Sequence, residues 1–195
     1  MTDSRGPSMT DAGEDIKLPR LEFIGDAMQF AARIHGMTLY SPLLENFSLA
    51  EIRLLARFMQ TYRASAGVEI IREGESGDFM MLLVEGRIEV TKQDRWNAPR
   101  LIAMVEAGGT IGEMSMIDGE PRFATCVAVE PALVAVLSRE SLARIILEQP
   151  ILGAKVLMEL ALMLSQRLRQ TSVRLITYLD KQRELQEQVQ GPGFV

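Results

Sequence analysis

Apolar positions recur with a helical period in two stretches near the start of the chain. In residues 23–37 most of them are three or four residues apart, a spacing typical of an amphipathic helix. They are Phe23, Ile24, Ala27, Phe30, Ala31 and Ile34. The run 41–48 interrupts this pattern. Ser48, followed by Glu51, is the signature of a capping box and predicts a second helix that ends near Tyr62.

From Gly67 onward the pattern changes to short apolar runs that are separated by turn residues. The runs have the length of strands, and the segments between them contain Gly, which favours turns. The runs occupy residues 68–71, 79–84, 87–90, 100–105 and 125–137, and residues 92–99 predict a hairpin loop. Several short strands at this spacing indicate a sandwich or roll of antiparallel strands.

Helical periodicity returns at Ser138, which can cap a short helix that reaches Glu148. Pro150 then marks a break, since proline has no N–H to donate within a helix. A longer helix follows, with a seam at alternating intervals of three and four residues: Ala161, Leu164, Leu168, Thr171, Leu175 and Tyr178. This heptad pattern predicts pairing with a second copy of the chain. Packing of the same stripe against the chain's own roll is the alternative.

The chain has 195 residues, of which 47% are apolar and 24% charged, a composition typical of one globular domain with extensions. Residues 1–22 predict a flexible tail rather than a signal peptide, because they lack a hydrophobic centre. We expect helices over 23–62, the roll over 63–138 and helices over 139–190, including a dimer helix.

Charge and cysteine content narrow the class of protein further. The net charge of −5 argues against nucleic-acid binding, which usually requires a basic face. The single cysteine, Cys126, can form no disulfide within the chain. No apolar stretch reaches the length of a membrane-spanning helix. We therefore expect a cytoplasmic protein without membrane contact.

The residues that carry chemistry lie in one segment, residues 112–125. Gly112 lets the backbone approach a ligand closely, and Glu113 offers acceptor oxygens that suit sugar hydroxyls. Arg122 offers a planar fork that matches phosphate oxygens. If residues 114–117 form a helical turn, its first N–H groups favour an anion. A sugar joined to a phosphate needs this combination, although the spacing alone also fits an unrelated surface pair.

The segment resembles the phosphate-binding cassette of cyclic-nucleotide-binding domains, whose motif is roughly G-E-[LM]-[AS]-L-x(4)-P-R-x-A-[TS]. The matching residues are Gly112, Glu113, Met114, Ser115, Pro121, Arg122, Ala124 and Thr125. The run 85–90 also resembles the family, and the resemblance extends from about Pro42 to Asp180. It implies an α+β fold: an antiparallel double-stranded β-roll, or jelly roll, flanked by N-terminal helices and a long C-terminal dimerisation helix.

The resemblance also implies how each matched residue acts. Glu113 would accept the ribose 2′-hydroxyl, and Arg122 would pair with the cyclic phosphate. The backbone N–H groups of Ser115 and Phe123 would complete the phosphate cradle. Further ligand-binding or supporting positions would be Gly112, Met114, Ala124 and Thr125, with Ile88 and Val105 lining an apolar pocket.

The long helix resembles the dimerisation helix of the catabolite activator protein family, because the motif R-L-x-x-T-S recurs over residues 167–172. The resemblance implies a homodimer in which Thr171 and Ser172 contact adenine, one from each protomer. A polar seam residue that sets the register of the paired helices is the alternative for Thr171. Phe123 stands where cyclic-GMP-selective kinase domains tend to have Thr. We therefore expect cyclic AMP as the ligand, with cyclic GMP as second choice, and no cofactor.

Activators of that family continue into a winged helix-turn-helix after the dimer helix. Only 15 residues follow Asp180, too few for such a domain, so we expect no direct DNA binding. No kinase, channel or cyclase segment is attached either. The expected protein is a cyclic-nucleotide sensor that has no catalysis of its own and signals through an effector protein that the sequence does not identify.

Two other functions stay open at this point. One is a scaffold or interaction protein on the same fold that does not bind nucleotide, although the presence of Glu113 and Arg122 argues against it. The other is an enzyme of the cupin type, whose sites usually need several His ligands. The chain has one histidine, His35, and it lacks HExxH, P-loop and Cys-cluster motifs. We therefore expect neither an enzyme nor a metal site.

Overall fold

The computed structural model describes residues 18–189, and these divide into two compact units, the first ending at Gly153 and the second beginning at Ala154. Most of the tail predicted over residues 1–22 lies outside the described residues. Residues 18–22, the part of the predicted tail that the structure describes, belong to the folded unit, because Leu18 and Leu21 pack against its hydrophobic core.

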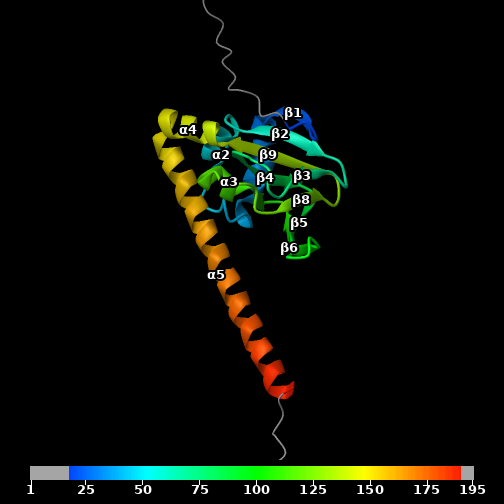
Figure 1. The fold of residues 1–195 in the computed structure, drawn as a ribbon. Coiled ribbons are helices and arrows are strands. Elements are labelled where there is room, and N and C mark those ends of the chain that lie inside the picture. The colour runs from blue at the N-terminus through cyan, green and yellow to red at the C-terminus, as the bar shows by residue number, and fades with distance from the viewer. Residues whose placement is uncertain (1–17, 190–195) are drawn as a thin grey trace, which may run out of the picture. The chain divides into compact units, whose positions relative to one another are not determined.

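The first unit is built on two antiparallel sheets, shown in Figure 1. One sheet has the order β1-β2-β9-β4-β7, with β1 (Glu22–Asp26), β2 (Gln60–Ala64), β9 (Ala132–Ser138), β4 (Phe79–Glu85) and β7 (Thr110–Ile111). The other has the order β3-β8-β5-β6, with β3 (Glu69–Ile71), β8 (Thr125–Ala128), β5 (Arg87–Gln93) and β6 (Pro99–Glu106). The prediction of an antiparallel β-roll in an α+β fold is confirmed.

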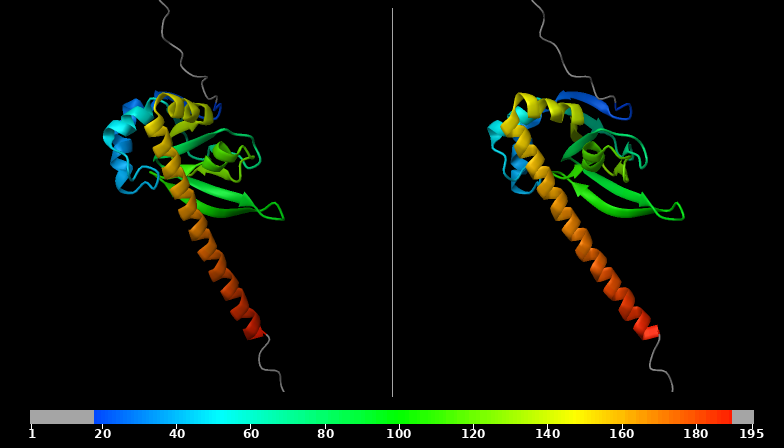
Figure 2. Two further views of the ribbon diagram at one scale, coloured as in Figure 1. Left: turned by 90° about the vertical axis from the view of Figure 1, so that its left-hand side faces the viewer. Right: turned by 60° about the vertical axis from the view of Figure 1, so that its left-hand side comes forward.

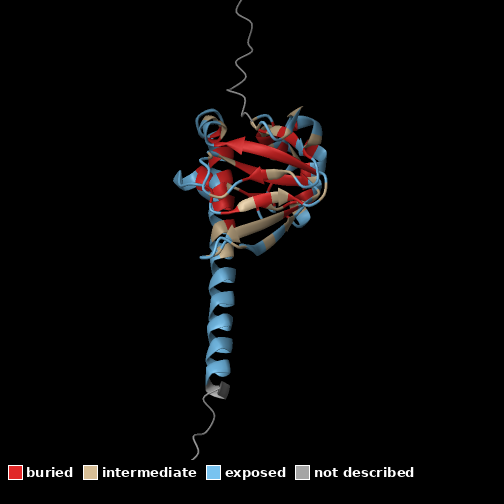
Figure 3. Cartoon of the chain, turned by 45° about the vertical axis from the view of Figure 1, so that its right-hand side comes forward, coloured by how far each residue is buried: buried red, intermediate tan, exposed pale blue. Residues whose placement is uncertain are grey.

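The two central strands of the larger sheet, β4 and β9, are the most deeply buried (Figure 3). In β4, Met81 and Leu83 belong to the core cluster together with residues of the second sheet, whereas Met80 and Leu82 are buried on the opposite face. Successive side chains of a strand point to opposite faces, so a continuous apolar run is required where both faces are covered.

The helix predicted over residues 23–37 is wrong in its first part. Glu22–Asp26 form β1 at the edge of the larger sheet, where they pair with β2 through a bulge near Gly25, whose φ is +139°. Asp26 then caps the first helical turn by accepting a hydrogen bond from the Met28 N–H. Apolar neighbours such as Phe23 and Ile24 fit a strand as well as a helix, and the free edge of β2 decides between them. The helical elements that follow are η1 (Ala27–Phe30), α1 (Ala31–Gly36) and η2 (Met37–Leu39).

The second predicted helix is confirmed at its start and wrong at its end. Ser48 and Glu51 form the expected capping box at the start of α2 (Leu49–Ala56). The helix ends at Ala56 rather than near Tyr62, because residues 60–64 form β2 between β1 and β9. The strands of the roll therefore run from Glu22 to Ser138 rather than over 63–138. The helices η1, α1 and α2 pack together at one end of the sheets (Figure 2).

The C-terminal helices start where the sequence predicts. Ser138 caps α4 (Arg139–Glu148) by accepting a hydrogen bond from the Ser141 N–H at 2.9 Å. Pro150 is the first residue of α5 (Pro150–Val189), a position where its missing N–H costs nothing. Among the described residues, no helix is both long enough and apolar enough to cross a membrane.

The second unit contains the remainder of α5, from Ala154 to Val189. In this helix Val156, Leu160 and Met163 are buried. The predicted seam is different, since Leu168, Leu175 and Tyr178 are all more than half exposed. The long helix of the prediction is therefore present, with much of its apolar seam uncovered in the single chain.

Candidate ligand site around Arg122

The segment that carries the candidate site begins with a short helix, α3 (Glu113–Asp118), bounded by two glycines. Gly112 (φ +78°) and Gly119 (φ +80°) both adopt left-handed backbone conformations, which are strained for residues with a side chain. The Gly119 N–H closes the helix by donating to Ser115 O at 3.0 Å. At the start of the helix, the Met116 N–H donates to Gly112 O at 3.3 Å.

The segment brings three polar side chains into the interior of the roll. Glu113, Ser115 and Arg122 are each no more than 4% exposed. Burial lowers the pKa of the Arg122 guanidinium, and the negative charges of Asp78 and Glu113 oppose this shift. The structure thus places the predicted carboxylate and guanidinium together in a buried site rather than on the surface.

Within residues 18–189, the two terminal nitrogens of the Arg122 guanidinium differ in their hydrogen bonds. Its Nη1 donates to Phe79 O and to Gly112 O, both at 2.8 Å, and its central carbon lies 4.1 Å from the centroid of the Phe79 ring. Its Nη2 is buried and has no hydrogen-bond partner among the described residues. A buried charged donor without an acceptor is unfavourable, so this nitrogen marks where an anionic acceptor would bind.

Two glycines make room for this guanidinium. A Cβ atom on Gly77 would lie 2.2–2.4 Å from three guanidinium atoms of Arg122, and one on Gly112 would lie 2.7 Å from Nη1. The sequence predicted Gly112 as a point of close approach for a ligand, whereas the close neighbour in the structure is Arg122 itself. The sequence reasoning missed Gly77, because it lies in a Gly-containing turn with no sign of what faces it.

The turn between β3 and β4 also fixes the backbone of Arg122. The Arg122 N–H donates to Glu75 O, and the Gly74 N–H donates to Arg122 O, both at 2.8 Å. Further along, Thr125 Oγ1 accepts from the Glu73 N–H at 3.0 Å, so Thr125 supports this turn. The sequence offered no signal for these contacts, which join segments far apart in the chain.

The predicted residue Phe123 lies at the surface, where it is 51% exposed. Lys92 Nζ lies 4.3 Å from the centroid of its ring and donates to Phe123 O at 2.8 Å. The same amine pairs with Glu73 Oε1 at 2.7 Å. The hydrogen bonds from Lys92 and from the Gln93 N–H hold the pKa of Glu73 below its usual value. The exposed ring is thus a neighbour of the site rather than part of its buried interior.

The other predicted positions of this segment differ in exposure. Met114 is 46% exposed, whereas Ala124 is buried. Cys126, in the following strand, is buried, and burial raises the pKa of its thiol to about 12. Arg139, which the sequence reasoning missed, donates to Ser115 O at 2.8 Å and to Met116 O at 2.6 Å. It thereby ties the end of α3 to the start of α4.

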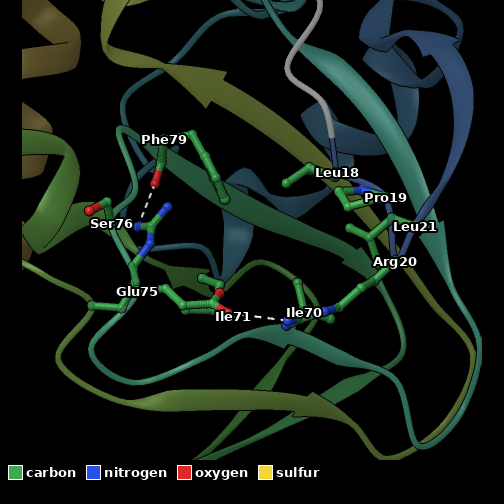
Figure 4. Close-up of a pocket in the computed structure, with 10 residues that line it drawn as sticks. Leu18, Pro19, Arg20, Leu21, Ile70, Ile71, Glu75, Ser76 and Phe79 are labelled. Carbon is green, nitrogen blue, oxygen red and sulfur yellow. Dashed lines mark hydrogen bonds and ion pairs between the residues drawn. The ribbon is translucent and has the colours of Figure 1, made fainter.

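A pocket of about 280 Å³ opens beside Arg122 (Figure 4). Its lining residues are Leu18, Pro19, Arg20, Leu21, Ile70, Ile71, Glu75, Ser76, Phe79 and Arg122. Neither Ile88 nor Val105, the predicted apolar lining, is among them. Ile88 is wholly buried in the core and pairs with Val105 across β5 and β6.

Comparison with known proteins places this geometry in a family. The family model described as "Cyclic nucleotide-binding domain" matches residues 62–149, which include α3 and Arg122. The crystal structure of a cyclic nucleotide-binding domain from Methylobacillus flagellatus KT is 38% identical, with a TM-score of 0.75. The match covers 82% of this chain and 90% of that one. The chain belongs to the cyclic nucleotide-binding domain family.

Curated relatives of this cyclic nucleotide-binding domain are longer proteins. The cyclic AMP receptor protein of Thermus thermophilus is 29% identical over 135 residues, which cover 69% of this chain and 61% of that protein. The cGMP-dependent protein kinase egl-4 of Caenorhabditis elegans is 32% identical over 106 residues, which cover 53% of this chain and 14% of the kinase. The chain thus spans less than two thirds of the length of either relative.

The purine-contacting residues predicted for this cyclic nucleotide-binding domain lie outside the matched range, on α5 in the second unit. The Thr171 hydroxyl donates to Arg167 O and the Ser172 hydroxyl to Leu168 O, both at 2.9 Å. Both side chains are exposed. Their contact with adenine stays a prediction.

Proposed function

We propose that the chain is a sensor whose ligand is a cyclic mononucleotide, bound through its phosphate at Arg122. The single observation that carries this proposal is the buried Nη2 of Arg122, which has no hydrogen-bond partner among the described residues. A cyclic phosphate supplies a negatively charged acceptor for that donor, and charge-assisted hydrogen bonds of this kind are among the strongest in proteins.

The neighbouring groups suit the rest of such a ligand. Glu113 is buried beside Gly112, and its carboxylate is an acceptor for the ribose 2′-hydroxyl. The backbone N–H groups of Ser115, near the start of α3, and of Phe123 complete the phosphate cradle in this proposal. In this arrangement, one end of the ribose-phosphate ring meets a carboxylate and the other end a guanidinium.

We propose cyclic AMP rather than cyclic GMP as the ligand. Phe123 stands at the position where cyclic-GMP-selective kinase domains tend to have Thr. Thr171 and Ser172 match the two residues that contact adenine in the catabolite activator protein family, which the long helix resembles. Relatives named for cyclic AMP and for cyclic GMP both match the chain. The comparisons therefore support a cyclic nucleotide, and the choice of purine rests on these three residues.

We further propose that the sensor works as a homodimer through α5 and has no catalytic activity of its own. The exposed seam residues Leu168, Leu175 and Tyr178 support pairing. A ligand shifts such an assembly only by its different affinity for two states. The net charge of −5 favours an effector protein over DNA as the recipient of the signal. A scaffold that does not bind nucleotide is the second candidate.

Isothermal titration calorimetry of the native chain with cyclic AMP and with cyclic GMP tests this function. Arg122→Ala and Arg122→Lys are the test variants, and Arg87→Ala is the matched control, because Arg87 forms an exposed ion pair with Glu130 at 3.4 Å. Losing the phosphate contact should weaken binding of cyclic AMP about 10- to 150-fold. The thermal unfolding of each variant shows whether it is folded.

The outcomes separate the candidates. Binding of cyclic AMP that Arg87→Ala retains and Arg122→Ala loses supports the sensor. Absence of heat with both nucleotides in the folded native chain would overturn it and favour the scaffold. Tighter binding of cyclic GMP than of cyclic AMP would retain the nucleotide sensor and overturn the choice of purine.

A further inference from the structure

Residues 18–21, here termed the strap, lie next to Arg122 although they are far from it in the sequence. The strap and Arg122 line the same pocket of about 280 Å³. Figure 4 shows the strap on one side of this pocket and Glu75, Ser76 and Phe79 on the other. A segment outside the matched family range thus borders the proposed phosphate-binding residue.

The strap is fixed by both apolar and ionic contacts. Leu18 and Leu21 pack against the hydrophobic core of the roll. Between them, Arg20 extends its guanidinium to two carboxylates: Nη1 lies 2.8 Å from Glu69 Oε1 and Nη2 lies 3.1 Å from Glu75 Oε1. The strap is therefore bound to Glu69, the first residue of β3, and to Glu75 in the turn that follows this strand.

The same turn holds Arg122. The Glu75 backbone carbonyl accepts from the Arg122 N–H, and the Gly74 N–H donates to Arg122 O, both at 2.8 Å. Gly77, in the same turn, lies directly against the guanidinium. Arg20 and Arg122 thus contact opposite ends of one residue, Glu75, the former at its carboxylate and the latter at its carbonyl.

We propose that Arg20 is a positioning residue for Arg122: its ion pair with Glu75 holds the turn that orients the phosphate-binding guanidinium. This inference rests on the proposed function, because it concerns binding of a phosphate at Arg122. Hydrogen bonds weaken steeply as their geometry departs from linear. A small displacement of residues 74–77 therefore lowers the affinity for the ligand without any loss of the guanidinium itself.

The alternative is that Arg20 and Glu75 form an ordinary surface ion pair with no effect on Arg122. The side chains of Arg20 and Glu75 are 38% and 45% exposed, and exposed ion pairs contribute little to the stability of the fold. Loss of Arg20 should therefore leave thermal unfolding almost unchanged. If Arg20 positions Arg122, its loss should instead lower the affinity for the nucleotide and speed the hydrogen exchange of the Gly74 N–H.

The first experiment measures cyclic AMP affinity by calorimetry for Arg20→Ala, Arg20→Lys and the control Arg87→Ala. We expect Arg20→Ala to weaken binding about two- to fivefold, with partial recovery in Arg20→Lys, which retains the charge. Glu75→Gln removes the Arg20–Glu75 pair and also the contact of Arg72 Nη1 with Glu75 Oε1 at 3.6 Å, so it should weaken binding at least as much as Arg20→Ala. Because the Arg20–Glu75 pair is shared by the two substitutions, the loss in the double variant should be smaller than the sum of the two single losses.

Equal affinities of Arg20→Ala and Arg87→Ala, in a native chain that binds cyclic AMP, would overturn the positioning role and leave the proposed function intact. If the native chain binds no nucleotide, the proposed function fails, and hydrogen exchange in the ligand-free protein decides the positioning role. Faster exchange of the Gly74 N–H in Arg20→Ala than in Arg87→Ala supports it. Unchanged exchange overturns it.

Discussion

The position of the Arg122 guanidinium depends on neighbours that leave space for it. Gly77 and Gly112 carry no side chain where a Cβ would collide with its nitrogens, and two backbone carbonyls accept from Nη1. The Phe79 ring covers the guanidinium at 4.1 Å. These contacts fix the orientation of the group and leave Nη2 without a partner among the described residues. The residue is therefore held in place before a ligand arrives, which lowers the cost of binding.

Gly77→Ala tests this arrangement at a single atom. The new methyl group would lie within 2.4 Å of the guanidinium, so either the turn or Arg122 has to move. We expect cyclic AMP affinity to fall roughly tenfold, in line with the usual cost of overpacking. Calorimetry measures this loss.

Gly36→Ala is the matched control for Gly77→Ala. A Cβ at Gly36 meets nothing within 4 Å, so affinity should stay at the native value. A folded Gly77→Ala protein with native affinity would show that the guanidinium does not need its observed position.

Among the elements, α3 connects the candidate site to the rest of the roll. Gly112 starts it, Gly119 ends it, and Arg139 binds the carbonyls of Ser115 and Met116 near its end. The Arg139 N–H also donates to Asp78 O at 2.7 Å. The start of α4 therefore contacts both α3 and the turn beside Arg122. Because Arg139 bonds to both of them, a displacement of α3 would strain the contacts of α4 and of this turn.

Arg139→Ala should loosen the end of α3. Removing two hydrogen bonds to carbonyl groups at a partly buried position should lower the free energy of unfolding by about 1–2 kcal/mol, measured by urea denaturation. Arg144→Ala, on the same helix, removes an exposed pair with Glu148 and should cost about 0.5 kcal/mol or less. Equal losses in the two variants would contradict a special role for Arg139.

The sequence predicted those parts of the site that lie within one short segment. Glu113 and Arg122 are brought together because the motif itself contains the turn that joins them. Gly77, Glu75 and Arg139 could not be found in this way, since each reaches the site through pairing of distant strands and turns. The strand β1 was missed for a related reason: the spacing of Phe23 and Ile24 fits both structures, and only the open edge of β2 selects the strand.

At the scale of the whole molecule, the roll contains the proposed nucleotide site and α5 carries a separate apolar surface. Leu168, Leu175 and Tyr178 on α5 are 69%, 56% and 60% exposed. Large apolar side chains repeated along a solvated helix are typical of an interface. The heptad spacing, 3 and 4 residues in alternation, matches the geometry of two helices packed side by side. The same stripe would bring Thr171 of each copy to the shared interface.

Leu168→Glu tests whether this surface joins two copies of the chain. A carboxylate at the seam would face its symmetry mate in a pair of helices, and burying two like charges is strongly unfavourable. We expect sedimentation equilibrium to show a dimer for the native chain and at least a tenfold weaker association for the variant. Val173→Glu is the control, because Val173 is 62% exposed on the same helix and its place in the heptad lies opposite the seam. A native chain that sediments as a monomer, or equal effects of the two substitutions, would contradict pairing through this seam.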